Sequence, residues 1–180
     1  MRTVAAGLAA LGAGVLLGTL VGVGTGSNWN TTDNSYKAGD SNVWFNQCAM
    51  QANTHDAFHA NDSHDIEPTD ITTSLSAAHD ACDTVDVRIN DFGYGTNRPR
   101  GFYECHVFNS PQNCDEGHAH INTSYSAIPE NYNETLEVVC EEIGHSVGLD
   151  HSDFDSSCMS NDVNARHLDG HDQGHLDDHY

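Results

Sequence analysis

Residues 140–151 of the chain read CEEIGHSVGLDH, and they close a segment with a clear helical pattern. The pattern begins at Asn131, which fits a capping box with Glu134 three residues later. Apolar residues then recur at helical spacing, at Leu136, Val139, Ile143 and Val147. Gly148 stands where a glycine ends a helix, because glycine tolerates a positive φ. The sequence therefore predicts a helix between Asn131 and Gly148.

The same segment carries metal-ligating side chains at a spacing that suits one ion. Residues i and i+4 lie on one face of a helix, so Glu141 and His145 can point at a common position. A sharp turn at Gly148 brings His151 back to that position. Two His and one carboxylate leave a fourth position open, as a catalytic zinc ion requires. Glu142 points to the side, where it can hold a water molecule and act as a general base.

This segment resembles the metzincin motif H-E-x-x-H-x-x-G-x-x-H of zinc peptidases, with Glu141 in place of the first His. Met159 follows within Ser-Cys-Met-Ser and resembles the methionine turn of these enzymes, and the His151-Ser152 pair is similar to the matrixin branch. The resemblance implies an α+β fold: a metzincin-like catalytic domain with a mixed twisted sheet, an active-site helix and a methionine turn. It also implies one catalytic Zn²⁺, with Glu142 as general base and three ligands, namely Glu141, His145 and His151. Ca²⁺ sites are left unassigned.

The rest of the chain gives weaker signals for helices and strands. We expect a helix over residues 42–60, where Val43, Trp44 and Cys48 share one helical face. A second, shorter helix is expected over residues 70–82, after a loop over residues 61–69. Three segments have the composition or alternation of strands: 85–89, 102–108 and 118–122. Strands followed by a strong helix indicate an α+β domain.

The N-terminal segment differs from the rest of the chain. Arg2 is its only charge, and residues 4–23 are apolar or small. A basic start and an apolar run are typical of a secretory signal, and the run also has the roughly 20 residues that span a bilayer. We expect residues 1–26 to be a signal peptide or an N-terminal anchor, residues 27–41 a linker, and residues 42–180 a metallopeptidase-like domain. Both alternatives for the first segment place that domain outside the cell.

The chain is strongly acidic, with 27 Asp and Glu against 6 Lys and Arg and a formal net charge of −21. This charge argues against nucleic acids and anionic membrane surfaces as partners, because both are negatively charged. It fits either a salt-adapted surface or an ordinary acidic secreted protein. We expect a polypeptide substrate, and membrane contact only through an uncleaved N-terminal segment. The oligomeric state is not indicated.

Six cysteines in an exported chain predict disulfides, and six cysteines allow fifteen connectivities. None lies in a Cys-x-x-Cys pair, which argues against a cysteine zinc ribbon. We expect Cys105–Cys114 around a local turn. We also expect Cys140–Cys158, which would brace the active-site helix against the methionine turn. Cys48–Cys82 then follows by elimination.

Histidines outside the motif allow more than one interpretation. His118 and His120 alternate on an expected strand and point the same way, so they are candidates for a second metal site or a substitute ligand. We expect His55, His59 and His64 at the surface. Four histidines near the C-terminus fit either metal-binding pairs or, as we expect, a solvated polar helix: His167, His171, His175 and His179.

Three functions are compatible with these patterns. The first is an exported zinc-dependent endopeptidase that hydrolyses peptide bonds with metal-activated water and Glu142 as the base. The second is a catalytically degenerate, zinc-binding relative that acts as a binding module, which Glu141 in place of His favours. The third is a His- and Asp-rich metal-sequestering protein, which would not need Glu142. The sequence favours the endopeptidase.

Overall fold

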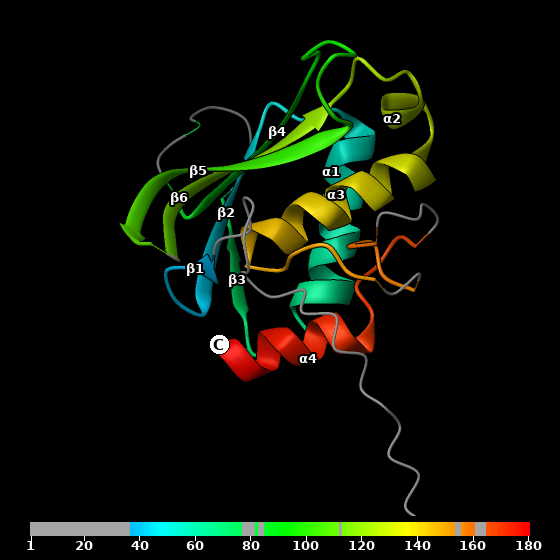
Figure 1. The fold of residues 1–180 in the computed structure, drawn as a ribbon. Coiled ribbons are helices and arrows are strands. Elements are labelled where there is room, and N and C mark those ends of the chain that lie inside the picture. Colours follow the sequence, from blue (N-terminus) through cyan, green and yellow to red (C-terminus); the bar gives the residue numbers. More distant parts are fainter. Residues whose placement is uncertain (1–36, 77–81, 83–84, 112, 154–155, 161–164) are drawn as a thin grey trace, which may run out of the picture.

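The structure, a computed structural model, describes residues 37–180 except 77–81, 83–84, 112, 154–155 and 161–164 (Figure 1). The predicted signal peptide or anchor and most of the predicted linker lie outside the described residues. Among the residues that are described, no helix is long and apolar enough to cross a membrane.

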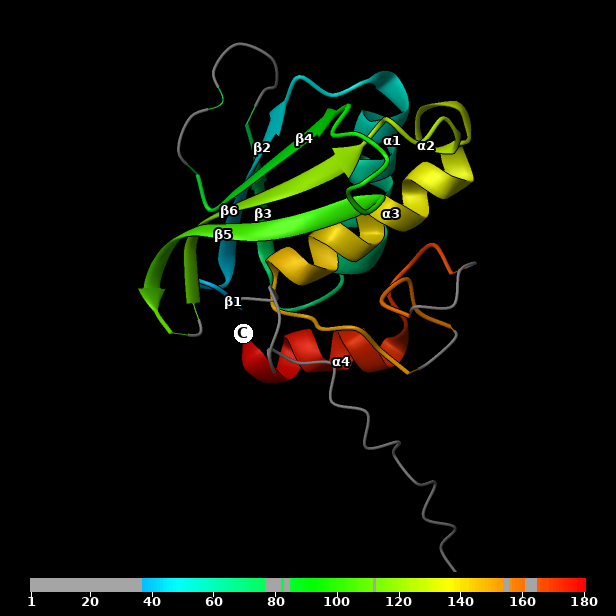
Figure 2. The same ribbon diagram turned by 45° about the horizontal axis from the view of Figure 1, so that its top comes forward.

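A six-stranded mixed sheet forms the centre of the domain (Figures 1 and 2). Its order is β1-β6-β4-β2-β3, and β5 also pairs with β6. Neighbouring strands are parallel except for β5 and β6, which form an antiparallel hairpin. The strands are Lys37–Ala38 (β1), Asn42–Cys48 (β2), Thr72–Leu75 (β3), Val87–Phe92 (β4), Gly101–Ser110 (β5) and Asn113–Asn122 (β6).

The helices are Ala52–Asn61 (α1), Ala127–Glu130 (α2), Tyr132–Ser146 (α3) and Gly170–His179 (α4), and a π-helical turn, Asp62–Ile66 (η1), extends α1. Two helices, α1 and α3, cover one face of this sheet, while α2 lies beyond them and α4 lies below (Figure 2). The longest, α3, packs against α1 and against β5 and β6. Phe58 of α1 contacts Phe45 of β2, with ring centroids 5.4 Å apart.

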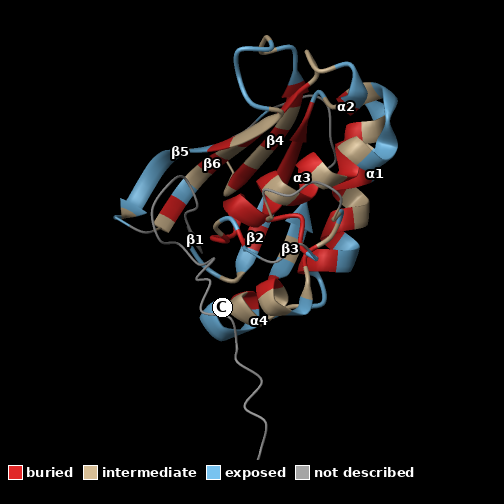
Figure 3. Ribbon diagram, turned by 45° about the vertical axis from the view of Figure 1, so that its right-hand side comes forward, coloured by how far each residue is buried: buried red, intermediate tan, exposed pale blue. Residues whose placement is uncertain are grey.

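The core lies between the sheet and the helices (Figure 3). Ile89 of β4 pairs with Ala119 of β6, and neither side chain has exposed surface. Their alternation with polar neighbours follows the two-residue period of a strand. His118 and His120, on either side of Ala119, therefore lie on the face that the helices leave uncovered.

Residues 42–48 form a strand, so the expected helix over residues 42–60 is wrong in its first part. Both edges of β2 are hydrogen-bonded, to β3 and to β4, and Val43 and Phe45 have no exposed surface. A strand between two parallel neighbours is rich in apolar residues, so periodicity alone does not separate it from a helical face. The helix begins only at Ala52.

Three other expectations also differ from the structure. The sequence predicts a helix over residues 70–82, but Thr72–Leu75 form β3, a strand at the edge of the sheet. Its β-branched threonines suit a strand, and pairing with β2 satisfies its backbone. The expected loop over residues 61–69 contains η1. Lys37–Ala38, placed in the linker, pair with β6 as β1.

The predicted strands at 85–89, 102–108 and 118–122 correspond to β4, β5 and β6, and the predicted helix is α3. Asn131 caps α3, because its side-chain oxygen accepts a hydrogen bond from the Asn133 backbone N–H at 3.1 Å. Glu134 does not complete the expected capping box but pairs with Arg100. An α+β domain with a mixed sheet and a long late helix is therefore confirmed.

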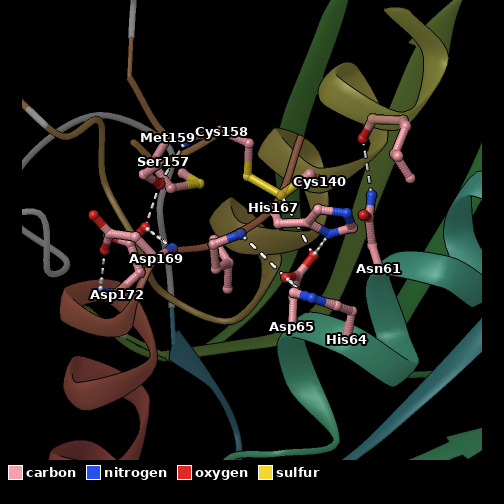
Figure 4. The surroundings of a disulfide bond; sticks show 12 residues. Asn61, His64, Asp65, Cys140, Ser157, Cys158, Met159, His167, Asp169 and Asp172 are labelled. Carbon is pink, nitrogen blue, oxygen red and sulfur yellow. Dashed lines mark hydrogen bonds and ion pairs between the residues drawn. A yellow bond between two sulfur atoms is a disulfide. The ribbon is translucent and has the colours of Figure 1, made fainter. Parts of the chain in front are cut away.

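Three disulfides join the six cysteines in the pairs expected from the sequence: Cys48–Cys82, Cys105–Cys114 and Cys140–Cys158. The second bridge crosses the β5–β6 hairpin. The third joins α3 to the turn that carries Met159 (Figure 4).

The Cys140–Cys158 bridge should matter for both stability and metal binding. The bridge spans 18 residues. Its replacement in a Cys140→Ser/Cys158→Ser variant should lower the unfolding free energy by about 3 kcal/mol in the chain-entropy model, measured by denaturant unfolding. A Cys105→Ser/Cys114→Ser variant is the control, since its bridge joins β5 to β6 and has no cysteine in α3. Only the first variant should also bind zinc more weakly in a chelator competition, and equal affinities would contradict a bracing role.

Candidate metal centre

Three side chains from the end of α3 and the turn after it converge on one point. The donor atoms of Glu141, His145 and His151 all lie within 4.8 Å of one another. Glu141 Oε1 lies 3.1 Å from His151 Nε2. The ring centroids of His145 and His151 are 4.9 Å apart. Ligand atoms around tetrahedral zinc are about 3.4 Å apart, because each lies about 2.1 Å from the ion. These residues therefore fit one ion after small side-chain movements.

The turn after α3 delivers His151 to this point. Gly148 has a φ of 101°, which side chains rarely adopt, and this fulfils the sequence prediction of a C-terminal glycine. The Leu149 N–H then donates to the Gly144 carbonyl at 2.9 Å, which folds the chain back over the last turn of the helix. Leu149 is fully buried and anchors the turn in the core.

His145 is buried and held in one orientation. Its Nδ1 lies 2.9 Å from the Leu149 carbonyl oxygen, which accepts a hydrogen bond from a protonated Nδ1. Nε2 is then the nitrogen left for a metal, and such a second hydrogen bond is typical of ligating histidines. Burial lowers the pKa of His145, although Glu141 and the Leu149 carbonyl act in the opposite direction. A neutral imidazole is the form that binds metal.

His151 is more exposed, and its charge depends on its neighbour. The hydrogen bond with Glu141 raises the pKa of His151, against the smaller opposing effect of burial. Glu141 Oε1 and His151 Nε2 thus already lie within hydrogen-bond distance of each other at the mouth of the site. An ion that both side chains bind would take the place of the proton in this hydrogen bond.

Glu142 lies beside the three candidate ligands and is almost completely buried, with 2% of its surface exposed. Among the described residues its Oε2 has no hydrogen-bond partner. Burial raises the pKa of Glu142 well above its usual value, and the charge of Glu141 adds to the rise. A buried carboxyl oxygen without a partner, next to a metal-ligand set, is suited to hold water and to accept its proton.

Sequence reasoning did not identify Gly101, which encloses Glu142 from the side of the sheet. A Cβ atom at this position would lie 2.3 Å from Glu142 Oε1. Any larger residue at this position would therefore displace the Glu142 side chain. Gly101 directly precedes the strand expected over residues 102–108, and in the structure it is the first residue of β5, where a glycine often marks a close approach of two backbones.

Met159 lies directly beneath α3, in the turn stabilised by the Cys140–Cys158 bridge (Figure 4). A Cβ atom on Gly144 would lie 2.3 Å from Met159 Sδ, so the contact needs a glycine. The Met159 N–H donates to Ser157 Oγ at 3.0 Å, and the Ser157 hydroxyl donates to the buried carboxylate of Asp172. The Ser152 N–H also donates to the Met159 carbonyl at 2.8 Å, which ties the residue after His151 to this turn.

A pocket opens between α3 and the start of β5. Its lining consists of Pro99, Gly101, Phe102, Tyr103, Glu141, Glu142, His145 and His151. Among the described strands, β5 pairs only with β6, so its second edge is an outer edge of the sheet. The metal-ligand set therefore lies in a pocket bordered by an open strand edge.

The other predicted histidines lie elsewhere. His118 and His120 are on the face of β6 turned away from α3, so neither can replace Glu141 as a ligand. With His106 they form a separate group whose donor atoms lie within 4.8 Å of one another. Burial, with His118 nearby, lowers the pKa of His120 to about 4. A second metal site there stays a prediction.

The expected polar helix near the C-terminus is present as α4, which carries His171, His175 and the exposed His179, but it is packed against the domain and is not fully solvated. Asp169 caps α4 in a capping box with Asp172, and Leu176 is fully buried. The Tyr180 hydroxyl donates to the Val147 carbonyl at 3.1 Å, next to the turn that delivers His151. The helix is thus packed beneath the metal centre, because a buried Asp and Leu anchor an otherwise polar sequence.

No protein-family model matches the chain, and no curated protein matches its sequence. Among solved structures, the chain is similar to metalloproteinase-II from Bacteroides fragilis, with 14% sequence identity and a TM-score of 0.45. The match covers 86% of this chain and 57% of that one, so the chain spans little more than half the length of the other protein. At this distance the likeness carries no information about activity or ligands.

The contact between Gly144 and Met159 should be sensitive to one methyl group. In Gly144→Ala, the added Cβ would overlap Met159 Sδ and displace the turn below α3. Overpacking of this kind typically costs about 1–3 kcal/mol, which thermal unfolding measures. Gly174→Ala is the matched control, because nothing lies within 4 Å of a Cβ there, and it should not destabilise the domain. Equal stability of the two variants would show that the contact does not constrain the turn.

Proposed function

We propose that the chain is an exported zinc-dependent endopeptidase, with Glu141, His145 and His151 as the metal ligands and Glu142 as the general base. The observation that carries this proposal is the position of Glu142. Its partnerless buried carboxyl oxygen lies beside three converging donor atoms, in a pocket that opens at a strand edge. A metal-sequestering protein would have no use for such a group.

The residues fit a catalytic metal better than a structural one. Three protein ligands leave a fourth position open, and the neutral, oriented His145 suits zinc. When bound there, zinc would lower the pKa of water and polarise the scissile carbonyl. Glu142 would take a proton from that water and return it to the leaving amine. Its raised pKa brings the carboxyl closer to the neutral pH at which both transfers are required.

A polypeptide substrate fits the free edge of β5. An extended peptide can add to an open strand edge through backbone hydrogen bonds, and the pocket then receives the bond to be cut. The three disulfides support an extracellular location, because structural disulfides persist in oxidising compartments. Export and a polypeptide substrate belong to the same proposal.

One observation favours a second candidate, a catalytically degenerate metal-binding relative that acts as a binding module. Glu141 and His151 can neutralise each other at 3.1 Å without a metal, which three histidines could not do. Casein hydrolysis with and without a chelator separates the candidates. The peptidase loses activity with its metal, whereas the binding module is inactive in both conditions.

Glu142→Gln should retain zinc and the fold but lose hydrolysis by about 10²–10⁴-fold, the usual contribution of a general base. Activity on casein, together with zinc content, measures both effects. Glu130→Gln removes an exposed carboxylate outside the pocket and should change neither. Full turnover by Glu142→Gln would remove this residue from the mechanism.

Glu141 should be needed for zinc affinity, and it should make the site less active near neutral pH. A carboxylate ligand lowers the net charge of the zinc site by one relative to three imidazoles, so bound water should be less acidic. Glu141→Ala should therefore lose most zinc in a chelator competition, because two ligands rarely hold the ion. Glu141→His should keep zinc and shift the acidic limb of the pH–activity profile to lower pH. Unchanged zinc binding and cleavage by Glu141→Ala would place the third ligand elsewhere.

A further inference from the structure

A second group of metal-ligating side chains lies where η1 meets the segment before α4 (Figure 4). Asp65 is buried, with 1% of its side chain exposed. His64 Nδ1 lies 2.9 Å from one of its carboxylate oxygens, and His167 Nδ1 lies 3.2 Å from the other. The two imidazole rings lie side by side, with centroids 4.0 Å apart and planes 33° apart.

The segments that carry these residues are held together by other bonds. The Leu168 N–H donates to Asp65 Oδ1 at 3.2 Å. Gln173 of α4 donates through its side-chain amide to the backbone carbonyls of His64 and Asp65, at 3.2 and 3.3 Å. Asp65 Oδ2 also lies 3.7 Å from the sulfur of Cys140. Packing and backbone contacts thus position the group before any ligand arrives, as a preformed site requires.

The charge of Asp65 is only weakly compensated. Among the described residues, no Lys or Arg forms an ion pair with this carboxylate, and its ion-pair partners are His64 and His167. Burial raises the pKa of Asp65, while the hydrogen bonds from His64 and His167 lower it. A buried carboxylate between two imidazoles is therefore an environment that a divalent cation would stabilise.

We propose that His64, Asp65 and His167 form a second zinc site, which fastens η1 to the segment between the Met159 turn and α4. The donor atoms lie within 4.8 Å of one another, and the N–O distances of 2.9 and 3.2 Å are close to the ligand spacing of about 3.4 Å around zinc. Each neutral imidazole needs only to carry its proton on Nε2 for Nδ1 to bind the ion. His64 and His167 are 61% and 36% exposed, so water can complete the coordination.

This site is independent of the proposed peptidase centre. None of its ligands lies in the pocket of Glu142, and its role is to join two segments about 100 residues apart in the chain. A cation that binds only the folded chain raises its stability by mass action. Zinc at this site should therefore protect both segments from local opening, whether or not the chain hydrolyses peptides.

The test is hydrogen exchange of the full chain, without metal and with Zn²⁺, followed by mass spectrometry of peptides that cover residues 61–67 and 165–170. Zinc should slow exchange in both segments of the wild-type chain. His64→Gln and His167→Gln should each lose this protection and bind one zinc ion fewer per chain, counted by elemental analysis. Each variant keeps one imidazole on Asp65, and circular dichroism without metal shows whether it is folded.

His179→Gln is the control, because His179 is exposed on α4 and outside this group. It should keep zinc-dependent protection of both segments. Absence of protection in the wild-type chain would overturn the proposal, and so would equal protection in either folded Gln variant. If one of the two Gln variants does not fold, the other still decides the test, because each removes one ligand of the proposed site.

Discussion

The contact of Met159 with the bare backbone of Gly144 is the constraint on which the geometry of the candidate metal centre depends. It places the turn at residues 157–160 against the last turns of α3, where a Cβ atom on residue 144 would lie 2.3 Å from Met159 Sδ and would force this side chain to shift. The disulfide reinforces this arrangement, because Cys140 directly precedes Glu141 and Cys158 directly precedes Met159. The Ser152 N–H reaches the Met159 carbonyl, so the position of His151 also follows from this turn. The contacts between α3 and the Met159 turn thus determine where the candidate ligands lie.

A second glycine acts on the opposite side of α3. Gly101 lets β5 approach Glu142 so closely that the carboxyl is enclosed between strand and helix. Enclosure removes the carboxyl from bulk solvent, and this raises the pKa of Glu142. The same approach borders the pocket with the free edge of β5. The glycine at position 101 therefore contributes both to the raised pKa of Glu142 and to the shape of the pocket beside it.

Local signals were enough to predict α3 and its candidate ligands. The cap at Asn131, the four-residue spacing of Glu141 and His145, and the turn at Gly148 all lie within one short segment. The strands β2 and β3 were missed because their evidence is not local. Phe45 is buried by β4 and by Phe58. The spacing of apolar residues within 42–48 cannot predict contacts with these distant segments.

The same limit explains the histidines. The alternation of His118 and His120 was evident in the sequence, but the helices determine which face of the sheet they occupy. His64 was expected at the surface, and more than half of its side chain is indeed exposed. Its contact with Asp65 brings it near His167, 103 residues later in the chain, which no spacing rule anticipates. Residues that converge through tertiary structure leave no signature in a single sequence.

The acidic composition of the chain determines which side chains can pair with its buried carboxylates. With 27 acidic residues and only 6 Lys and Arg, few fixed cations can compensate a buried carboxylate. Arg100 is already engaged by Glu134 and Glu137. Asp65 and Glu141 instead face imidazoles, which carry a positive charge only when they are protonated. Among the described residues, the ion-pair partners of these two carboxylates are therefore imidazoles and not lysine or arginine. A carboxylate beside a protonated imidazole is neutralised by the charge of that ring. When a divalent ion binds both side chains, the ion supplies the positive charge and the imidazole is neutral.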